Sequence, residues 1–337
     1  MRGAEVAFRE AMTRFGYHAS HEQYAPGELL SYARLAADSG FDGVLSSDHF
    51  HPWLEENGHS GYAWSWLGAA LQATTTSFGV VCAPGDRYHP AVVAQAAATL
   101  AEMFPERFWM AVGSGEALNE HVTGSAWPKK SERNARLRES ADVMRALWRG
   151  ESVTHRGHVD VVDARLYSLS ARPPRVLGAA VTEQTAEWLG SWADGLVTTG
   201  RDRDAMARMI AAFRRGGGEG KPVFVQHVLA WAPDEDDARS AAHEQWRFAA
   251  ISDEHLLWDL RTPADFARAT REITPEDVAR TIPTSSDFDV HIERLSVYAD
   301  LGVDRVYCLN VVRNQREFIQ AFAREVLPAL ARPASRR

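Results

Sequence analysis

Several residues in the chain have types and spacing that suit proton transfer or ligand binding. Asp48 and His49 are adjacent, and a carboxylate beside an imidazole can orient the ring or raise its pKa. Glu116 lies in a turn between two glycines, where the backbone can approach a ring or a phosphate closely. Trp53 could stack on a planar ligand. Each residue also fits a structural role, as a hydrogen-bonded loop histidine, a tight turn or a packed indole.

These segments follow short apolar runs that we predict to be β-strands. Eight such runs alternate with helical patterns, at 13–19, 41–46, 78–83, 107–112, 175–180, 195–199, 222–230 and 305–312. This alternation predicts a parallel sheet, and 337 residues suit a (β/α)8 TIM barrel of the α/β class with insertions. The rival, a doubly wound open sheet, would need a glycine fingerprint that the first turn lacks. Barrel chemistry lies at the carboxyl ends of the strands, so the polar segments should converge there.

We predict one barrel domain over residues 13–330, followed by a solvated tail over 331–337. Two segments exceed what a minimal barrel needs. Residues 150–174 contain short alternating runs and predict a hairpin insertion. Residues 246–283 are charged, partly helical and rich in proline, and they lie between the seventh and eighth strands. We expect this second insertion to cover the barrel mouth as a helical lid.

Composition narrows the classes of partner. The net charge is -8 without a long basic run, so we expect no nucleic acid partner. We find no apolar run of about 18 residues and no leader pattern, so we expect a cytoplasmic protein without a membrane partner. Cys82 and Cys308 lie in apolar runs and predict core thiols rather than a disulfide or metal pair, as in a reducing compartment.

His49, His51 and His59 raise a second hypothesis, a metal-dependent barrel hydrolase. A catalytic zinc or iron site needs three protein ligands, themselves held by further hydrogen bonds. The last predicted strand offers no aspartate at its carboxyl end. We therefore expect no metal, and metal analysis of the purified protein would test this. A third hypothesis is a barrel that binds a planar ligand without catalysis.

The blocks around these residues resemble the luciferase-like monooxygenase superfamily, in the branch that contains the deazaflavin-dependent glucose-6-phosphate dehydrogenases. The similar blocks are 15–23, 47–53, 87–91 and 113–120, and the resemblance covers about residues 13–330. It implies a TIM barrel, usually a homodimer, that binds FMN or coenzyme F420 across the strand ends. The implied activity is hydride transfer with a small-molecule substrate, or oxygen activation if the cofactor is FMN.

The resemblance also implies roles for individual residues. His49 would accept a proton from a substrate hydroxyl, Trp53 would pack near the reacting carbon, and Glu116 would exchange a proton with the ring. The expected cofactor-binding residues are Asp48, Val80, Val81, Ser114, Gly115, Asn119, Val181 and Thr182, with a non-proline cis peptide at Val80–Val81. The expected substrate-binding residues are Glu22, Thr198, Arg201 and Trp258.

The sequence departs from the dehydrogenase pattern at three places. Leu257–Trp258 stands where that branch has a Lys–His pair, and Thr281 stands where it has an arginine. Losing cationic donors predicts a non-phosphorylated, more apolar substrate. Val181–Thr182 replaces a Gly–Gly turn near the cofactor phosphate. The sequence is most similar to a subgroup thought to use FMN, which favours FMN over coenzyme F420.

Overall fold

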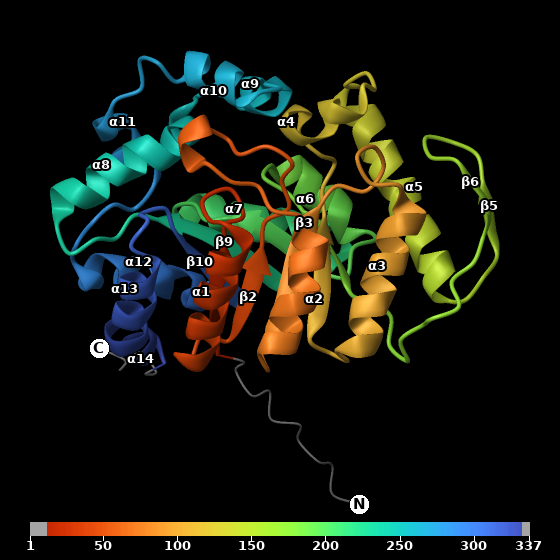
Figure 1. Ribbon diagram of the computed structural model, residues 1–337, viewed down its shortest axis with the longest axis horizontal. Coiled ribbons are helices and arrows are strands. Elements are labelled where there is room, and N and C mark those ends of the chain that lie inside the picture. Colours follow the sequence, from red (N-terminus) through yellow and green to blue (C-terminus); the bar gives the residue numbers. More distant parts are fainter. Residues whose placement is uncertain (1–11, 332–337) are drawn as a thin grey trace, which may run out of the picture.

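The computed structural model describes residues 12–331, apart from the side chains of residues 254 and 255. Eight parallel strands close into a barrel in the order β1-β10-β9-β8-β7-β4-β3-β2 (Figure 1). This confirms the predicted (β/α)8 barrel, and each strand lies within its predicted run or begins one residue before it. The strands are β1 (Arg14–Ala19), β2 (Gly43–Ser46), β3 (Ser77–Cys82), β4 (Phe108–Val112), β7 (Val176–Ala179), β8 (Leu196–Thr199), β9 (Val223–Leu229) and β10 (Arg305–Asn310).

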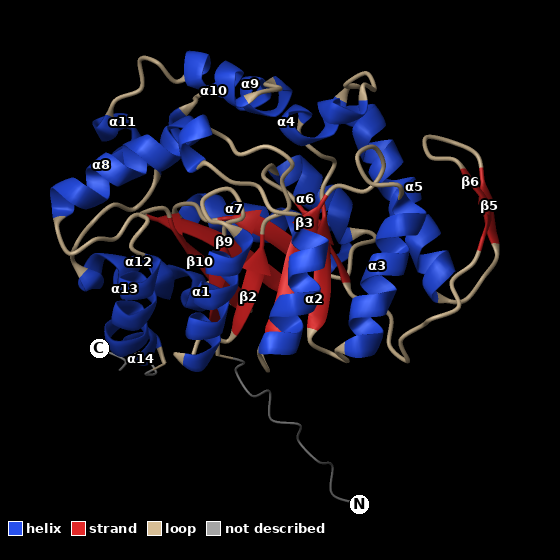
Figure 2. Cartoon of the chain, in the orientation of Figure 1, coloured by secondary structure: helices blue, strands red, loops and turns tan. Residues whose placement is uncertain are grey.

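Helices surround the strands on the outside of the barrel (Figure 2). Several begin where the sequence supplies a start signal: Pro26 and Pro90 occupy first-turn positions, and the side chains of Thr182 and Asp202 accept backbone N–H groups. The barrel helices are α1 (Pro26–Asp38), α2 (Ala63–Ala73), α3 (Pro90–Met103), α4 (Ala117–Glu120), α5 (Lys130–Trp148), α6 (Glu183–Gly190), α7 (Arg203–Phe213), α12 (Phe288–Asp300), α13 (Gln315–Ala321) and α14 (Leu327–Leu330).

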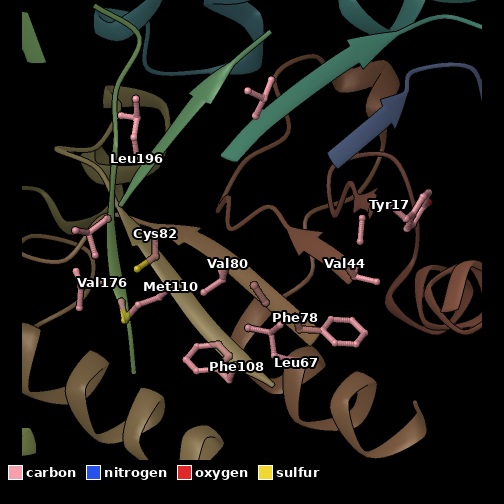
Figure 3. Packing of buried hydrophobic residues seen from close by; sticks show 14 of the residues in the cluster. Tyr17, Val44, Leu67, Phe78, Val80, Cys82, Phe108, Met110, Val176 and Leu196 are labelled. Carbon is pink, nitrogen blue, oxygen red and sulfur yellow. The ribbon is translucent and has the colours of Figure 1, made fainter. Parts of the chain in front are cut away.

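Two layers of apolar side chains hold the barrel together. The outer layer packs strands against helices and includes Phe78 and Met110, which are fully buried (Figure 3). The inner layer fills the barrel itself, with Trp109 packed against Phe224 and near Tyr307. Gly79 is required beside this indole, since an added Cβ would lie 2.1 Å from the Trp109 ring. The filled interior gives the residues above it a rigid floor.

Two excursions interrupt the barrel repeats. An antiparallel pair, β5 (Val153–His155) and β6 (Val161–Ala164), lies between α5 and β7, within the segment predicted to form a hairpin. Between β9 and β10 the chain forms α8 (Glu235–Trp246), α9 (Glu254–Asp259), α10 (Pro263–Ala269) and α11 (Pro275–Thr281). These helices cross one end of the barrel (Figure 1). They begin earlier than predicted, because Asp234 caps α8 with two backbone N–H bonds.

None of the described helices is long and apolar enough to span a membrane. Both cysteines are buried and unpaired, as predicted.

Candidate active site

A cavity of about 1480 Å³ lies at the carboxyl ends of the barrel strands. Ligand pockets commonly span about 300–1,000 Å³, so this cavity has room for a cofactor and a substrate together. Strand-end loops and residues from the lid segment line it. The predicted site residues on its wall are Glu22, Asp48, His49, Trp53, Val81, Ser114, Gly115, Glu116, Asn119, Val181, Thr182, Thr198, Arg201 and Trp258. The convergence expected from the barrel topology is therefore present in the structure.

Val80 is the predicted site residue that does not line the cavity. Side chains alternate along β3, so Val81 faces the cavity while Val80 is fully buried between strands and helices (Figure 3). The expected cis peptide bond at Val80–Val81 is not found: every peptide bond among residues 12–331 is trans. The sequence argument placed both valines at the ring, and the structure places only the side chain of Val81 on the wall.

We call the linked group of Glu22, His49, Asn119 and Glu116 the base end of the cavity. Asn119 Oδ1 accepts a hydrogen bond from the backbone N–H of Phe50 at 2.8 Å, which fixes the orientation of the amide. The Asn119 amide nitrogen is then directed at His49 Nδ1, at 3.3 Å, and at Glu116 Oε2, at 3.5 Å. His49 Nδ1 therefore acts as an acceptor, and its proton lies on Nε2.

Glu22 is the carboxylate beside His49, with Oε1 3.5 Å from Nε2. Its other oxygen accepts hydrogen bonds from Ser20 and Ser47 at 2.9 and 2.8 Å. Burial opposes ionisation of Glu22, but His49, a backbone N–H and the two hydroxyls together lower its pKa. The buried charge on Glu22 would stabilise an imidazolium at His49. The sequence suggested Asp48 for this role, and the signal for Glu22 was its place directly after the first strand.

Asp48 has other partners. Tyr88 donates its hydroxyl to Asp48 Oδ1 at 2.9 Å, and Arg87 Nη2 lies 3.4 Å from Oδ2. Arg87 also binds Glu120, through its backbone N–H at 2.8 Å. Burial raises the pKa of Glu120 to about 7, although Arg87 opposes the shift. Arg87 thus contacts two buried carboxyl groups, those of Asp48 and Glu120. Neither Arg87 nor Glu120 was predicted as part of the site.

The pKa of Glu116 is shifted in the opposite direction from that of Glu22. Burial raises the pKa of Glu116, the nearby Glu22 carboxylate raises it further, and His49 and Arg87 oppose the shift. The one hydrogen-bond contact of its side chain among the described residues is the long contact to Asn119. Two carboxyl groups of one cavity are thus pushed in opposite directions, Glu22 toward the charged form and Glu116 toward the protonated form. Such divergence is typical of paired acid and base groups.

Trp53 connects the base end to the lid segment. Its indole stacks on Phe248 with ring centroids 4.6 Å apart and an interplanar angle of 16°, and it lies 5.0 Å from the His49 ring. Trp246 is the last residue of α8 and Phe248 lies two residues further along the chain, and both line the cavity. The lid segment is tied to the opposite rim by a hydrogen bond of 2.8 Å from Trp127 Nε1 to Asp259. The indole of Trp53 is therefore held by its aromatic neighbours and forms part of the apolar wall of the cavity.

The second polar region of the cavity, which we call the anchor end, contains Thr198, Arg201, His227 and Tyr298. Thr198 Oγ1, Arg201 Nε and His227 Nε2 are buried atoms without a hydrogen-bond partner among the described residues. His227 Nδ1 lies 2.9 Å from the Tyr298 hydroxyl. The sequence analysis missed His227 and Tyr298. His227 interrupts an apolar strand, which was the available signal, whereas α12 gave no hint that Tyr298 faces the cavity.

The metal hypothesis gains no support from the geometry. Among residues 12–331 no group of three or more His, Cys, Asp or Glu side chains is placed to hold a metal ion. His51 binds the carbonyl of Leu118 through Nδ1 and stacks on His121, away from His49.

The match to a family model and the similarity to a solved structure identify this closed barrel as a TIM-barrel oxidoreductase of the luciferase-like class. The chain belongs to the luciferase-like monooxygenase family, whose family model matches residues 11–305. This confirms the resemblance found in the sequence.

Three comparisons place the chain within the family. An F420-dependent glucose-6-phosphate dehydrogenase of Microbacterium testaceum is 36% identical over 330 residues, covering 94% of this chain and 97% of that protein. The enzyme of the same name from Beutenbergia cavernae is 34% identical, covering 95% and 98%. The solved structure of an F420-dependent secondary alcohol dehydrogenase, in complex with an F420-acetone adduct, is similar with a TM-score of 0.88 and 29% identity. It covers 95% of this chain and 100% of that one.

Proposed function

We propose that this oxidoreductase is a coenzyme F420-dependent dehydrogenase that oxidises a hydroxyl group of a small substrate. The observation that carries the proposal is the base end: His49 has an acceptor atom, Nδ1, held by a long contact to Asn119, a carboxylate favoured in its charged form lies beside its other nitrogen, and the pKa of a second carboxyl group is raised. The relatives named above are F420-dependent enzymes that act on a sugar phosphate or an alcohol, which supports the same reading.

The cavity wall suits a planar deazaflavin. Val81 on β3 and Gly115 in the loop after β4 present small apolar surfaces, and Ser114 supplies a hydroxyl that accepts a hydrogen bond from Lys130 Nζ at 2.8 Å. His18 Nδ1 is a buried polar atom on the same wall without a partner among the described residues. We propose that Val81, Ser114, Gly115 and Asn119 hold the ring. These wall features suit the ring of either cofactor, and the F420-dependent relatives favour F420. The titration described below separates the two cofactors.

The bound deazaflavin would supply the hydride acceptor, and the protein would handle the protons. His49 Nδ1 would exchange its contact with Asn119 for one with the substrate hydroxyl and accept that proton. Glu22, already charged, would stabilise the imidazolium that results. Glu116, whose pKa is raised by burial, would hold the proton that the ring side of the site requires. Trp53 and the lid residues around it would exclude water from this step.

The substrate proposal changes from the one based on sequence. Leu257 and Trp258 line the cavity, as expected, and they favoured a non-phosphorylated substrate. The relatives' names do not support that choice. The anchor end offers the Arg201 guanidinium and the Thr198 hydroxyl to an oxygen-rich group, which suits a phosphate ester. We take glucose 6-phosphate as the first substrate to test.

The decisive experiment is a titration of the purified protein with F420 and with FMN, followed by fluorescence, and then an assay with glucose 6-phosphate. We expect tight binding of F420, weak binding of FMN and reduction of F420 when glucose 6-phosphate is added. Tight binding of FMN alone would overturn the cofactor assignment. Binding of F420 without turnover of glucose 6-phosphate or of 2-propanol would overturn the proposed reaction.

A further inference from the structure

His227 and Tyr298 form a buried pair that none of the roles above requires. His227 lies near the carboxyl end of β9 and is 3% exposed, and Tyr298 on α12 is 2% exposed. Their rings meet edge to face with centroids 5.4 Å apart, and the hydroxyl lies 2.9 Å from His227 Nδ1. Both residues line the active-site cavity.

The backbone beside the pair is shaped to fit it. Gly200 follows β8 and donates its N–H to the carbonyl of Gln226 at 2.8 Å, which draws the two strand ends together. A Cβ at Gly200 would lie 2.5 Å from the Tyr298 hydroxyl and 2.9 Å from His227 Nδ1. Such contacts are too close for any side chain, so glycine is the residue that lets the backbone pass over the pair.

The hydrogen bonds of the pair set the tautomer of His227. A phenol hydroxyl is a better donor than acceptor and a neutral imidazole nitrogen is a good acceptor, so we assign the 2.9 Å contact as the Tyr298 hydroxyl donating to His227 Nδ1. Burial lowers the pKa of His227 to about 3, with His291 and Arg294 adding to the shift, and the ring is therefore neutral at neutral pH. A neutral imidazole carries one N–H, and because Nδ1 accepts a bond, the proton lies on Nε2.

The Nε2–H group has no partner among the described residues, although its atom is fully buried. Thr198 Oγ1 and Arg201 Nε are in the same state on the neighbouring strand end. Buried donors are nearly always bonded, so three unpaired ones around one part of a cavity indicate a missing acceptor. Arg201 has no carboxylate within ion-pair distance in the described part of the chain, although its guanidinium binds the carbonyl of Val181.

We propose that His227 is a specificity-determining residue that donates its Nε2–H to an acceptor oxygen at the end of the substrate remote from the reacting carbon. Tyr298 is the positioning residue that fixes the tautomer, and Gly200 lets the pair form. The group is a neutral donor, which would bind an acceptor oxygen without adding to the positive charges of Arg201 and Arg294. This inference rests on the proposed function for the identity of the substrate, but not for the state of His227.

The tautomer is tested without cofactor or substrate. In protein labelled with 15N-histidine, the His227 signals are identified by their absence in His227→Gln. We expect an unprotonated Nδ1 and a protonated Nε2 from pH 6 to pH 8, and in Tyr298→Phe we expect the two shifts to move toward each other. A protonated Nδ1 in the wild type, or unchanged shifts in Tyr298→Phe, would overturn the assignment.

Kinetics test the contact with substrate. We expect His227→Ala to raise the KM for glucose 6-phosphate about tenfold with kcat changed less than about threefold, and the Kd for F420 to stay the same. His227→Gln places an amide N–H near the position of Nε2–H and should recover most of the loss. An unchanged KM in both variants would contradict the proposal. If wild-type protein binds F420 but does not oxidise glucose 6-phosphate, the proposed substrate is wrong while the nitrogen shifts still decide the state of His227.

Discussion

The base end and the anchor end share one cavity but differ in how their polar atoms are satisfied. At the base end, the side chains of Glu22, His49, Asn119 and Glu116 are linked to one another or to neighbouring hydroxyl and backbone groups. At the anchor end, three buried polar atoms have no partner among the described residues. The groups that we propose to react are therefore oriented before a ligand arrives, whereas the three anchor-end atoms would be satisfied by a ligand. Preorganisation is most valuable where charge develops during the reaction.

The largest effect should come from the base end. We expect His49→Ala to lower kcat by about 10²–10⁴-fold, because the proton acceptor for the substrate hydroxyl is lost, with little change in the Kd for F420. The matched control is His51→Ala in the same loop, whose side chain binds a carbonyl outside the base end. Steady-state assays and a fluorescence titration measure both quantities. Turnover of His49→Ala at the wild-type rate would contradict the assignment of the base end as the reacting end of the cavity.

Glu120→Gln tests how the buried Glu120 carboxyl group, next to the base end, affects stability. The Glu120 pKa is raised from 4.5 to about 7, so the folded state favours the neutral carboxyl group. Wild-type stability should therefore be full below the ordinary pKa and fall as the pH rises through about 7, by up to about 3 kcal/mol. We expect Glu120→Gln to remove this loss in urea unfolding at pH 5 and pH 8. Glu102→Gln, at an exposed position on α3, is the control. A wild-type stability that rises over this range would contradict the prediction.

Glu116→Gln tests whether a protonated carboxyl group serves the ring side of the site. Since the Glu116 pKa is raised, its protonated form persists to higher pH and is then lost as the pH increases. Wild-type kcat should fall on the alkaline side, and the variant should be slower by roughly tenfold to 100-fold and should lack this limb. A pH profile of kcat measures the effect. An identical profile for both proteins would show that Glu116 does not titrate in the reaction.

The smallest effect should come from one donor at the anchor end. Thr198→Val keeps the side-chain shape and removes the buried hydroxyl, so the KM for glucose 6-phosphate should rise about fivefold with kcat unchanged. Assays with glucose provide the comparison, because the KM for a substrate without the phosphate group should rise less. Equal changes in KM for both substrates would mean that the hydroxyl does not bind the phosphate end.

The barrel could be predicted because its signals are local. Each strand is a short apolar run, several helices begin at a proline or a capping residue, and alternation of the two fixes a parallel sheet. Barrel topology then brings the strand ends together, which is why Asp48, His49 and Glu116 could be expected in one cavity. The same logic failed for Val80, because a one-residue step along a strand reverses the face.

The partners within the site could not be predicted in the same way. Asp48 is next to His49 in the chain, yet Glu22, 27 residues away, is the carboxylate that faces the imidazole. Likewise, Tyr298 is 71 residues from His227. Sequence adjacency says little about side-chain contact in an extended segment, where successive side chains point in opposite directions.

The sequence alone determined the fold, the end of the barrel that carries the chemistry and the family, since these follow from periodicity and from short ordered motifs. The tertiary structure decided which carboxyl group has a lowered pKa, which has a raised pKa and which buried polar atoms have no partner among the described residues. Those properties depend on burial and on contacts between distant segments, because desolvation and nearby charges set a pKa and only packing brings them together.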